Sequence, residues 1–203
     1  MKTLIQFINE ASMPEYITEG YNFRPKDKDE LQKIVKRLIR KRGKDANLND
    51  IDVSNITDMS ELFRDLDPHN INISNWDVSN VKNMKGMFYY CEHFNYNLSN
   101  WDVSNVKDMS GMFAVCEHFN GDLSDWDVSN VKDMICMFID CKQFNSDLSR
   151  WNVSKVKHMK SMFAGCHNFD SDLSEWDVSN VGNMENMFND CKNLKNIPSW
   201  YNE

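Results

Sequence analysis

Cysteine is the residue type in this sequence with the widest choice of chemistry, and five of the six cysteines are regularly spaced. Cys91, Cys116, Cys141, Cys166 and Cys191 recur every 25 residues. Such a column could form disulfides, bind a metal or remain as thiols. Because five residues cannot pair fully, disulfide geometry is strict, and free cysteine is among the most buried residue types, the spacing favours a ladder of buried thiols. Cys136 lies outside the ladder and is expected to be the exposed thiol.

A second column carries carboxylates. Asp77, Asp102, Asp127 and Asp177 have the same period, with Asn152 in the place between the last two. Stacked carboxylates could bind calcium, which leaves a calcium-dependent binder as one alternative. The interpretation that we favour is an Asx-type turn, in which each side chain accepts backbone N–H bonds.

Catalytic patterns are missing from the sequence. His93 and His118 share a column, but no Ser, Cys or Asp arrangement completes a triad with the scattered histidines. Neither a P-loop nor a dinucleotide-binding glycine pattern is present. We therefore expect no catalytic residue, no cofactor and no metal site, and we predict that the protein is not an enzyme.

The element that must position all these columns is a repeat of 25 residues. Tryptophan, phenylalanine and methionine columns have the same period as the cysteines. The phenylalanine column is Phe63, Phe88, Phe113, Phe138, Phe163 and Phe188. A period between about 20 and 50 residues is typical of a solenoid, in which stacked units share one core. The sequence of 203 residues has no apolar run long enough to span a membrane.

Within a unit, residue spacing predicts a short helix and a short strand. Asn105 followed by Asp108 resembles a helix N-cap with an acidic N3 residue. The apolar residues after it have helical spacing and predict about two helical turns; they are Val106, Met109, Met112 and Phe113. The segment 122–128 is expected to be extended, with a kink between Leu123 and Trp126. Strands of successive units would pair in parallel.

The unit MF-x-x-C-x-x-FN-x-DLS-x-WDVSNV-x-x-M resembles the BspA-like leucine-rich repeats over roughly residues 44–200. The resemblance implies an α/β repeat solenoid, a right-handed leucine-rich-repeat-like stack of about six strand–short-helix rungs with an N-terminal capping helix. Members of that family bind other molecules and offer no catalytic residues. The departures are Ile51 for Trp, Leu66 for Cys, and Lys155 and His158 at the cap positions of the fifth unit.

Three regions follow from this division. We expect a leader and spacer in residues 1–23, a capping helix and half-rung in 24–50, and six repeats with a C-terminal cap in 51–203. Residues 24–44 contain ten Lys/Arg and three Asp/Glu. This charge could contact nucleic acid, but the stripe of apolar residues favours a capping helix that begins at Asp27 or Asp29 and ends at Gly43.

The first residues, MKTLIQFINEA, resemble the capsid-targeting leader of internal head proteins in T-even-type phages. That resemblance implies cleavage by a prohead protease after Glu in an Ile/Leu-x-Glu sequence that precedes a small residue. Two places fit this rule: Ile8 to Glu10 before Ala11, and Ile17 to Glu19 before Gly20. Gln6 replaces the Glu expected in such a leader. Through residues 1–20 the partners would be the capsid scaffold and the prohead protease.

Variable positions of the repeat must supply any binding surface. Tyr89, Tyr90 and Tyr96 are aromatic residues outside the core columns, and we expect them to form one contact patch. The sequence thus predicts a monomeric phage internal head protein, located in the virion and then in the host cytoplasm, that binds a host protein. It predicts neither nucleic acid nor membrane as a partner. The alternative is a BspA-like bacterial surface adhesin, which would need an export signal that residues 1–12 do not resemble.

Overall fold

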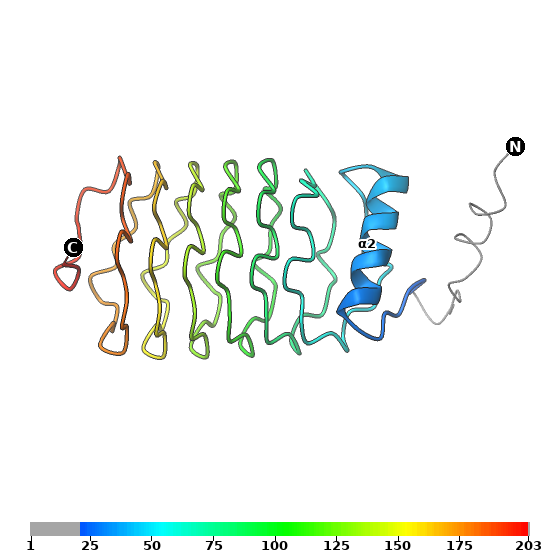
Figure 1. The fold of residues 1–203 in the computed structure, drawn as a ribbon, viewed down its shortest axis with the longest axis horizontal. Coiled ribbons are helices and arrows are strands. Elements are labelled where there is room, and N and C mark those ends of the chain that lie inside the picture. The colour runs from blue at the N-terminus through cyan, green and yellow to red at the C-terminus, as the bar shows by residue number, and fades with distance from the viewer. Residues whose placement is uncertain (1–20, 203) are drawn as a thin grey trace, which may run out of the picture.

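The chain winds through similar coils that are stacked side by side along one axis, with a helix against the first of them (Figure 1). This computed structural model describes residues 21–202. Within that range the helix is α2, Lys28–Arg42. In residues 21–202, strand pairing is limited to isolated parallel bridges. Those of the repeat join Asp58, Asn83, Asp108, Asp133, His158 and Asn183 in succession.

Backbone N–H groups alternate between two acceptors along each coil, and this alternation holds the stack together. The N–H groups of Met84, Gly86 and Phe88 donate to carbonyls of the next coil at 2.8–2.9 Å. Those of Met87 and Tyr89, between them, donate to carbonyls three residues back at 3.1 Å. Alternate backbone N–H groups therefore serve the local turns and the contacts between coils.

The helix expected in each unit does not form. Residues after Asn105 make successive turns, and the Asn105 side chain donates to the Ser79 carbonyl of the preceding coil at 2.8 Å instead of capping a helix. An α-helix would use every N–H group within its own coil and would remove the bonds to the next one. Parallel bridges also lie at Asp108 and Asp133 rather than in segment 122–128.

Two equivalent positions in each 25-residue coil have positive φ, which produces the succession of turns. Glu61, Cys136 and Ser161 have φ of 57°, 54° and 53° at equivalent positions, where Gly86 and Gly111 also lie. The segment 122–128 has the expected kink as a turn, because the Trp126 N–H donates to the Leu123 carbonyl at 3.1 Å. A chain of turns, rather than a helix, thus brings these apolar residues to the same side of the backbone.

Aromatic columns fill the interior. All of Phe88, Phe113 and Phe138 are fully buried, and the rings of neighbouring coils stack 5.6–5.7 Å apart. The indole N–H of Trp126 donates to the Leu98 carbonyl of the preceding coil at 3.0 Å. Trp151 makes the equivalent bond to the Leu123 carbonyl at 2.9 Å. The large side chains thus stabilise both packing and the register between coils.

Helix α2 covers the N-terminal end of the stack. Asp27 is its N-cap and accepts the Glu30 N–H at 2.9 Å, and Gly43 follows its last residue with a φ of 90°. Its buried stripe is Leu31, Ile34, Val35 and Leu38. At its end, the Arg42 guanidinium binds both carboxylate oxygens of Asp50, at 2.7 and 2.8 Å. The basic segment is therefore a cap, as the apolar stripe predicts.

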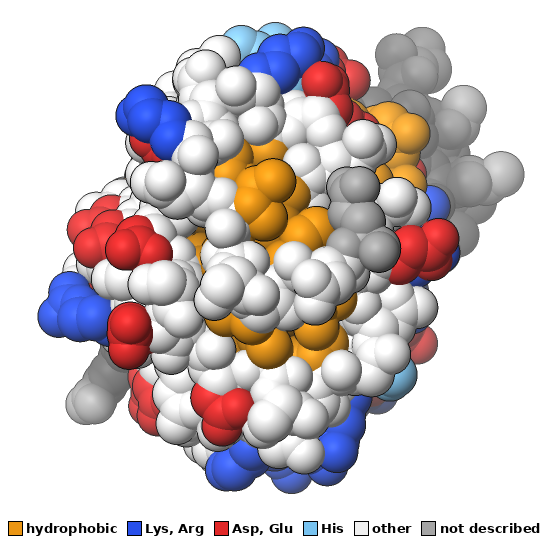
Figure 2. Space-filling model, turned by 90° about the vertical axis from the view of Figure 1, so that its left-hand side faces the viewer, with side chains coloured by type: hydrophobic (Ala, Val, Ile, Leu, Met, Phe, Trp, Pro, Cys, Tyr) orange, Lys and Arg blue, Asp and Glu red, His pale blue; other side chains and the backbone are white. Residues whose placement is uncertain are grey.

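The opposite end of the stack is more open. Figure 2 looks at this end and shows apolar side chains among uncharged ones, with charged side chains toward the rim. Val181, Met184 and Trp200 are only partly buried there, and Ile197 is 62% exposed. No helix in residues 21–202 is long and apolar enough to cross a membrane.

Candidate functional site: the Tyr89 groove

A groove of about 370 Å³ runs across neighbouring coils on the surface. We call it the Tyr89 groove; it is lined by Glu61, Arg64, Lys85, Gly86, Tyr89, Asp108, Ser110, Gly111, Asp133, Ile135 and Cys136. Gly86 and Gly111 take the positive-φ position in two adjacent coils, where Glu61 and Cys136 take it on either side. Two consecutive coils without a side chain here leave the hollow between them.

Aromatic and charged side chains meet at one end of the groove. The Arg64 guanidinium lies 4.9 Å from the centre of the Tyr89 ring, a cation–π contact. It also pairs with Glu61 at 2.9 Å. The Tyr89 and Tyr90 rings are perpendicular, with centres 4.6 Å apart, and Tyr90 is 45% exposed. Burial raises the pKa of the Tyr89 hydroxyl and Tyr90 raises it further.

Only part of the predicted aromatic patch is brought together. Tyr89 and Tyr90 touch, but Tyr96 lines a separate hollow beside Trp101. Its hydroxyl donates to the Asn72 side chain at 2.9 Å and its ring packs against the core. Tyr96 therefore stabilises the junction of two coils and lies apart from Tyr89 and Tyr90, outside the groove. The sequence alone does not identify Ile135 and predicts Cys136 only as an exposed thiol; both line the groove, in the coil next to that of Gly111.

The cysteine column is a ladder of free thiols, as predicted. Cys116 and Cys141 are buried, and each Sγ donates to a Phe carbonyl of the preceding coil, at 3.0 and 2.9 Å. Burial raises the pKa of both thiols well above the ordinary range. Cys136 is half-buried and lies in the groove. The ladder thus has a structural role as a row of hydrogen-bond donors.

The aspartate column forms Asx turns, which confirms the favoured interpretation. Asp77 and Asp127 each accept the N–H of the serine two residues later, at 3.0 and 2.9 Å. Hydrogen bonds from Ser129, first its hydroxyl and then its N–H, lower the pKa of Asp127. These carboxylates are therefore occupied by their own turns.

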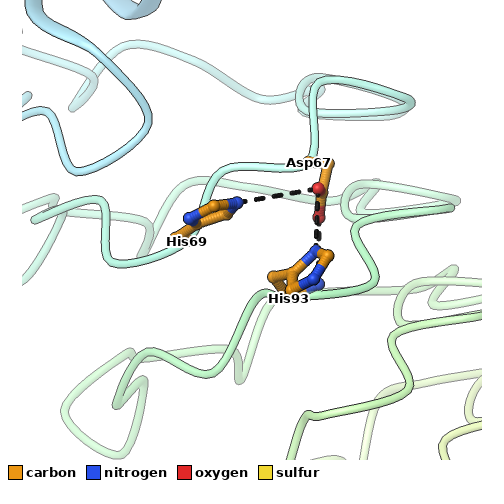
Figure 3. A group of neighbouring side chains, drawn as sticks. All are labelled: Asp67, His69 and His93. Atoms are coloured by element: carbon orange, nitrogen blue, oxygen red, sulfur yellow. Dashed lines mark hydrogen bonds and ion pairs between the residues drawn. The ribbon is translucent and has the colours of Figure 1, made fainter.

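Histidines gather at a second place, which the sequence argument missed. Asp67, His69 and His93 converge at the surface from two neighbouring coils (Figure 3). The His93 ring also stacks on that of His118 with centres 5.3 Å apart, as their shared column predicts. His69 precedes His93 by 24 residues rather than 25, so it does not follow the repeat and gives no signal in the column.

The predicted processing sites, Glu10 with Ala11 and Glu19 with Gly20, lie outside the described residues. The described chain begins at Tyr21, before α2, and ends at Asn202.

These features define a protein of stacked 25-residue coils with a surface groove and with most of its reactive side chains engaged between coils. The sequence matches the family model described as "Mycoplasma protein of unknown function, DUF285" over residues 31–147 and 121–203. The chain belongs to this family. Comparisons with curated proteins and with solved structures give no significant match.

Proposed function

We propose that this protein is a non-enzymatic protein–protein interaction module, built as a right-handed, BspA-like leucine-rich-repeat solenoid, and that the Tyr89 groove is its binding surface. The observation that carries the proposal is the contrast between the groove and the rest of the repeat. Thiols, turn carboxylates and every indole except that of Trp101 are engaged by neighbouring backbone groups. Groove side chains vary from coil to coil, as a surface adapted to one partner requires.

The composition of the groove suits a protein partner. Tyr89, Arg64 and Ile135 provide an aromatic ring, a guanidinium and an aliphatic side chain, and aromatic residues and arginine are enriched at binding hot spots. Lys85 and Asp108 add charges of both signs, which favour one orientation of the partner. No single-sign patch that would select nucleic acid lines the groove.

We propose further that the protein is a phage internal head protein, trimmed in the capsid and delivered with the DNA, whose partner is a host protein and whose effect is counter-defence or host takeover. The support is the resemblance of residues 1–20 to a capsid-targeting leader with two Ile-x-Glu sequences. Reduced, buried thiols suit a cytoplasm, where disulfides are rare.

The binding role is tested by comparing the host proteins captured by three forms of the chain. Tyr89→Ala should lower the amount of a specific partner captured by at least tenfold, because truncation of an aromatic hot-spot residue costs about 2 kcal/mol or more. Arg150→Ala is the matched control, since Arg150 is exposed and lies outside the groove. Quantitative mass spectrometry measures the capture. Equal capture by all three forms would rule out the groove.

The processing role is tested by co-expression with a prohead protease of a T-even-type phage, followed by N-terminal sequencing. We expect new N-termini at Ala11, Gly20 or both, and loss of the corresponding product in Glu10→Gln and Glu19→Gln. Glu15→Gln is the control, because Glu15 follows Met13 and Pro14 and does not fit the Ile/Leu-x-Glu rule. An intact Met1 in all samples contradicts the proposal.

A further inference from the structure

Asp67, His69 and His93 bring three metal-ligating atoms to one point of the surface (Figure 3). The Asp67 Oδ2 atom lies 3.0 Å from His93 Nδ1 and 3.8 Å from His69 Nε2. All three atoms lie within 4.8 Å of one another. We propose that these residues form a binding site for a divalent transition-metal ion of the Zn²⁺ type.

The distances suit tetrahedral coordination. Zinc binds imidazole nitrogen and carboxylate oxygen at about 2.0–2.2 Å, which places two ligands of a tetrahedron about 3.3–3.6 Å apart. The observed separations of 3.0 and 3.8 Å lie on either side of this range. Closing the site requires side-chain rotations that bring all three ligand atoms, now within 4.8 Å of one another, to this spacing. Two imidazoles and one carboxylate are a donor set that Zn²⁺ accepts and that Ca²⁺ and Mg²⁺ do not favour.

The backbone holds these ligands before any ion binds. Asp67 Oδ1 accepts the backbone N–H of His93 at 2.9 Å, so the other carboxylate oxygen is directed at the rings. The His69 N–H donates to the Lys44 carbonyl at 3.1 Å. The His93 ring lies between the rings of His69 and His118, with centres 4.9 and 5.3 Å away. Such support around the ligands raises metal affinity.

A neighbouring ammonium group contacts the Asp67 carboxylate. The Lys44 Nζ atom lies 3.0 Å from Asp67 Oδ2 and occupies part of the space around that oxygen. Lys44 is 47% exposed and can turn away into solvent. An ion must therefore compete with this ammonium group.

The site is open on one side. The His93 side chain is 52% exposed and that of His69 is 40% exposed. With three protein ligands, the fourth position of a tetrahedral ion is left for water or for a side chain of a bound protein, as in sites that keep an exchangeable ligand.

The test is calorimetric titration of the untagged full chain with zinc chloride. All forms carry Cys136→Ser, which removes the half-buried thiol outside the ladder as a competing ligand. We expect saturable binding of one ion per chain, and His93→Gln should weaken it at least tenfold. His118→Gln is the matched control: His118 stacks on His93 but is outside the ligand group, so its replacement should change affinity by less than about threefold. Lys44→Met should strengthen binding, because it removes the competing charge.

Circular dichroism verifies that each form is folded, and His93→Gln should fold because the backbone N–H that binds Asp67 remains. Three results would overturn the proposal: no saturable binding, binding unchanged in His93→Gln, or an equal loss in His93→Gln and His118→Gln. None of these results bears on the Tyr89 groove, whose test uses different residues.

Discussion

Replacing Phe113 by alanine is expected to lower the free energy of unfolding by about 3–5 kcal/mol, the range for a phenylalanine removed from a packed core. Phe113 is fully buried, and its ring stacks on Phe88 at 5.6 Å, on Phe138 at 5.7 Å and on Phe119 at 4.2 Å. Backbone bonds on both sides fix the spacing of the coils, including Phe113 N–H to the Met137 carbonyl at 2.9 Å. Since the neighbours cannot collapse into the space, the cavity persists and the cost is high.

Phe188 provides a matched control in the same column. It lies at the open end, is 8% exposed and stacks on Phe163 of one neighbouring coil at 5.8 Å. Phe188→Ala should cost less than half as much as Phe113→Ala, because a site near solvent can relax. Urea unfolding followed by circular dichroism measures both. Equal losses would show that the stack does not distinguish its middle from its end.

The core of this protein was predictable because the same residue types recur at the same positions of every repeat. A single phenylalanine such as Phe113 does not reveal whether it is buried, whereas a phenylalanine at the same position of every unit predicts a shared interior. The same reasoning identified the thiol ladder and the Asx turns of Asp77 and its equivalents. Each of these features depends on residue type and period alone.

The backbone path was not predictable in the same way. Val106, Met109, Met112 and Phe113 fit a helix, yet the coil places all four in the interior through turns in which two residues, four apart, have positive φ. Residues such as Cys136 and Ser161 have no intrinsic preference for that conformation. Hydrogen bonds to the next coil determine this backbone conformation. Their acceptors lie about 25 residues away in the sequence, so no local sequence pattern predicts them.

The candidate sites show the same division. Tyr89 and Tyr90 stand out as aromatic residues at variable positions, so the sequence locates one end of the groove. The hollow itself arises because Gly86 and Gly111 have no side chain. A search of the sequence for functional side chains does not identify such positions. Asp67 and His93 meet only because two coils are adjacent, and His69 joins them from a position outside the repeat.

Alkylation of the native protein at pH 8 should modify Cys136 before any other cysteine. Burial raises the pKa of Cys191 to about 12, which lowers its thiolate fraction about a thousandfold relative to an ordinary thiol. The fully buried Cys116, Cys141 and Cys166 have still less thiolate and no access to reagent. Burial raises the pKa of Cys136 as well, but Lys160 opposes the shift and the side chain is half-exposed.

The measurement is a time course with iodoacetamide, read by peptide mass spectrometry, with the protein unfolded in guanidinium chloride as the control in which all six cysteines react alike. Cys136→Ser should abolish the fast phase, and a fast phase of two or more thiols would contradict the buried ladder. Because Cys136 lines the Tyr89 groove, its alkylation rate also reports on that surface. A protein bound in the groove must slow the fast phase, whereas a protein bound elsewhere leaves it unchanged. The alkylation rate of Cys136 therefore distinguishes binding in the groove from binding at another surface.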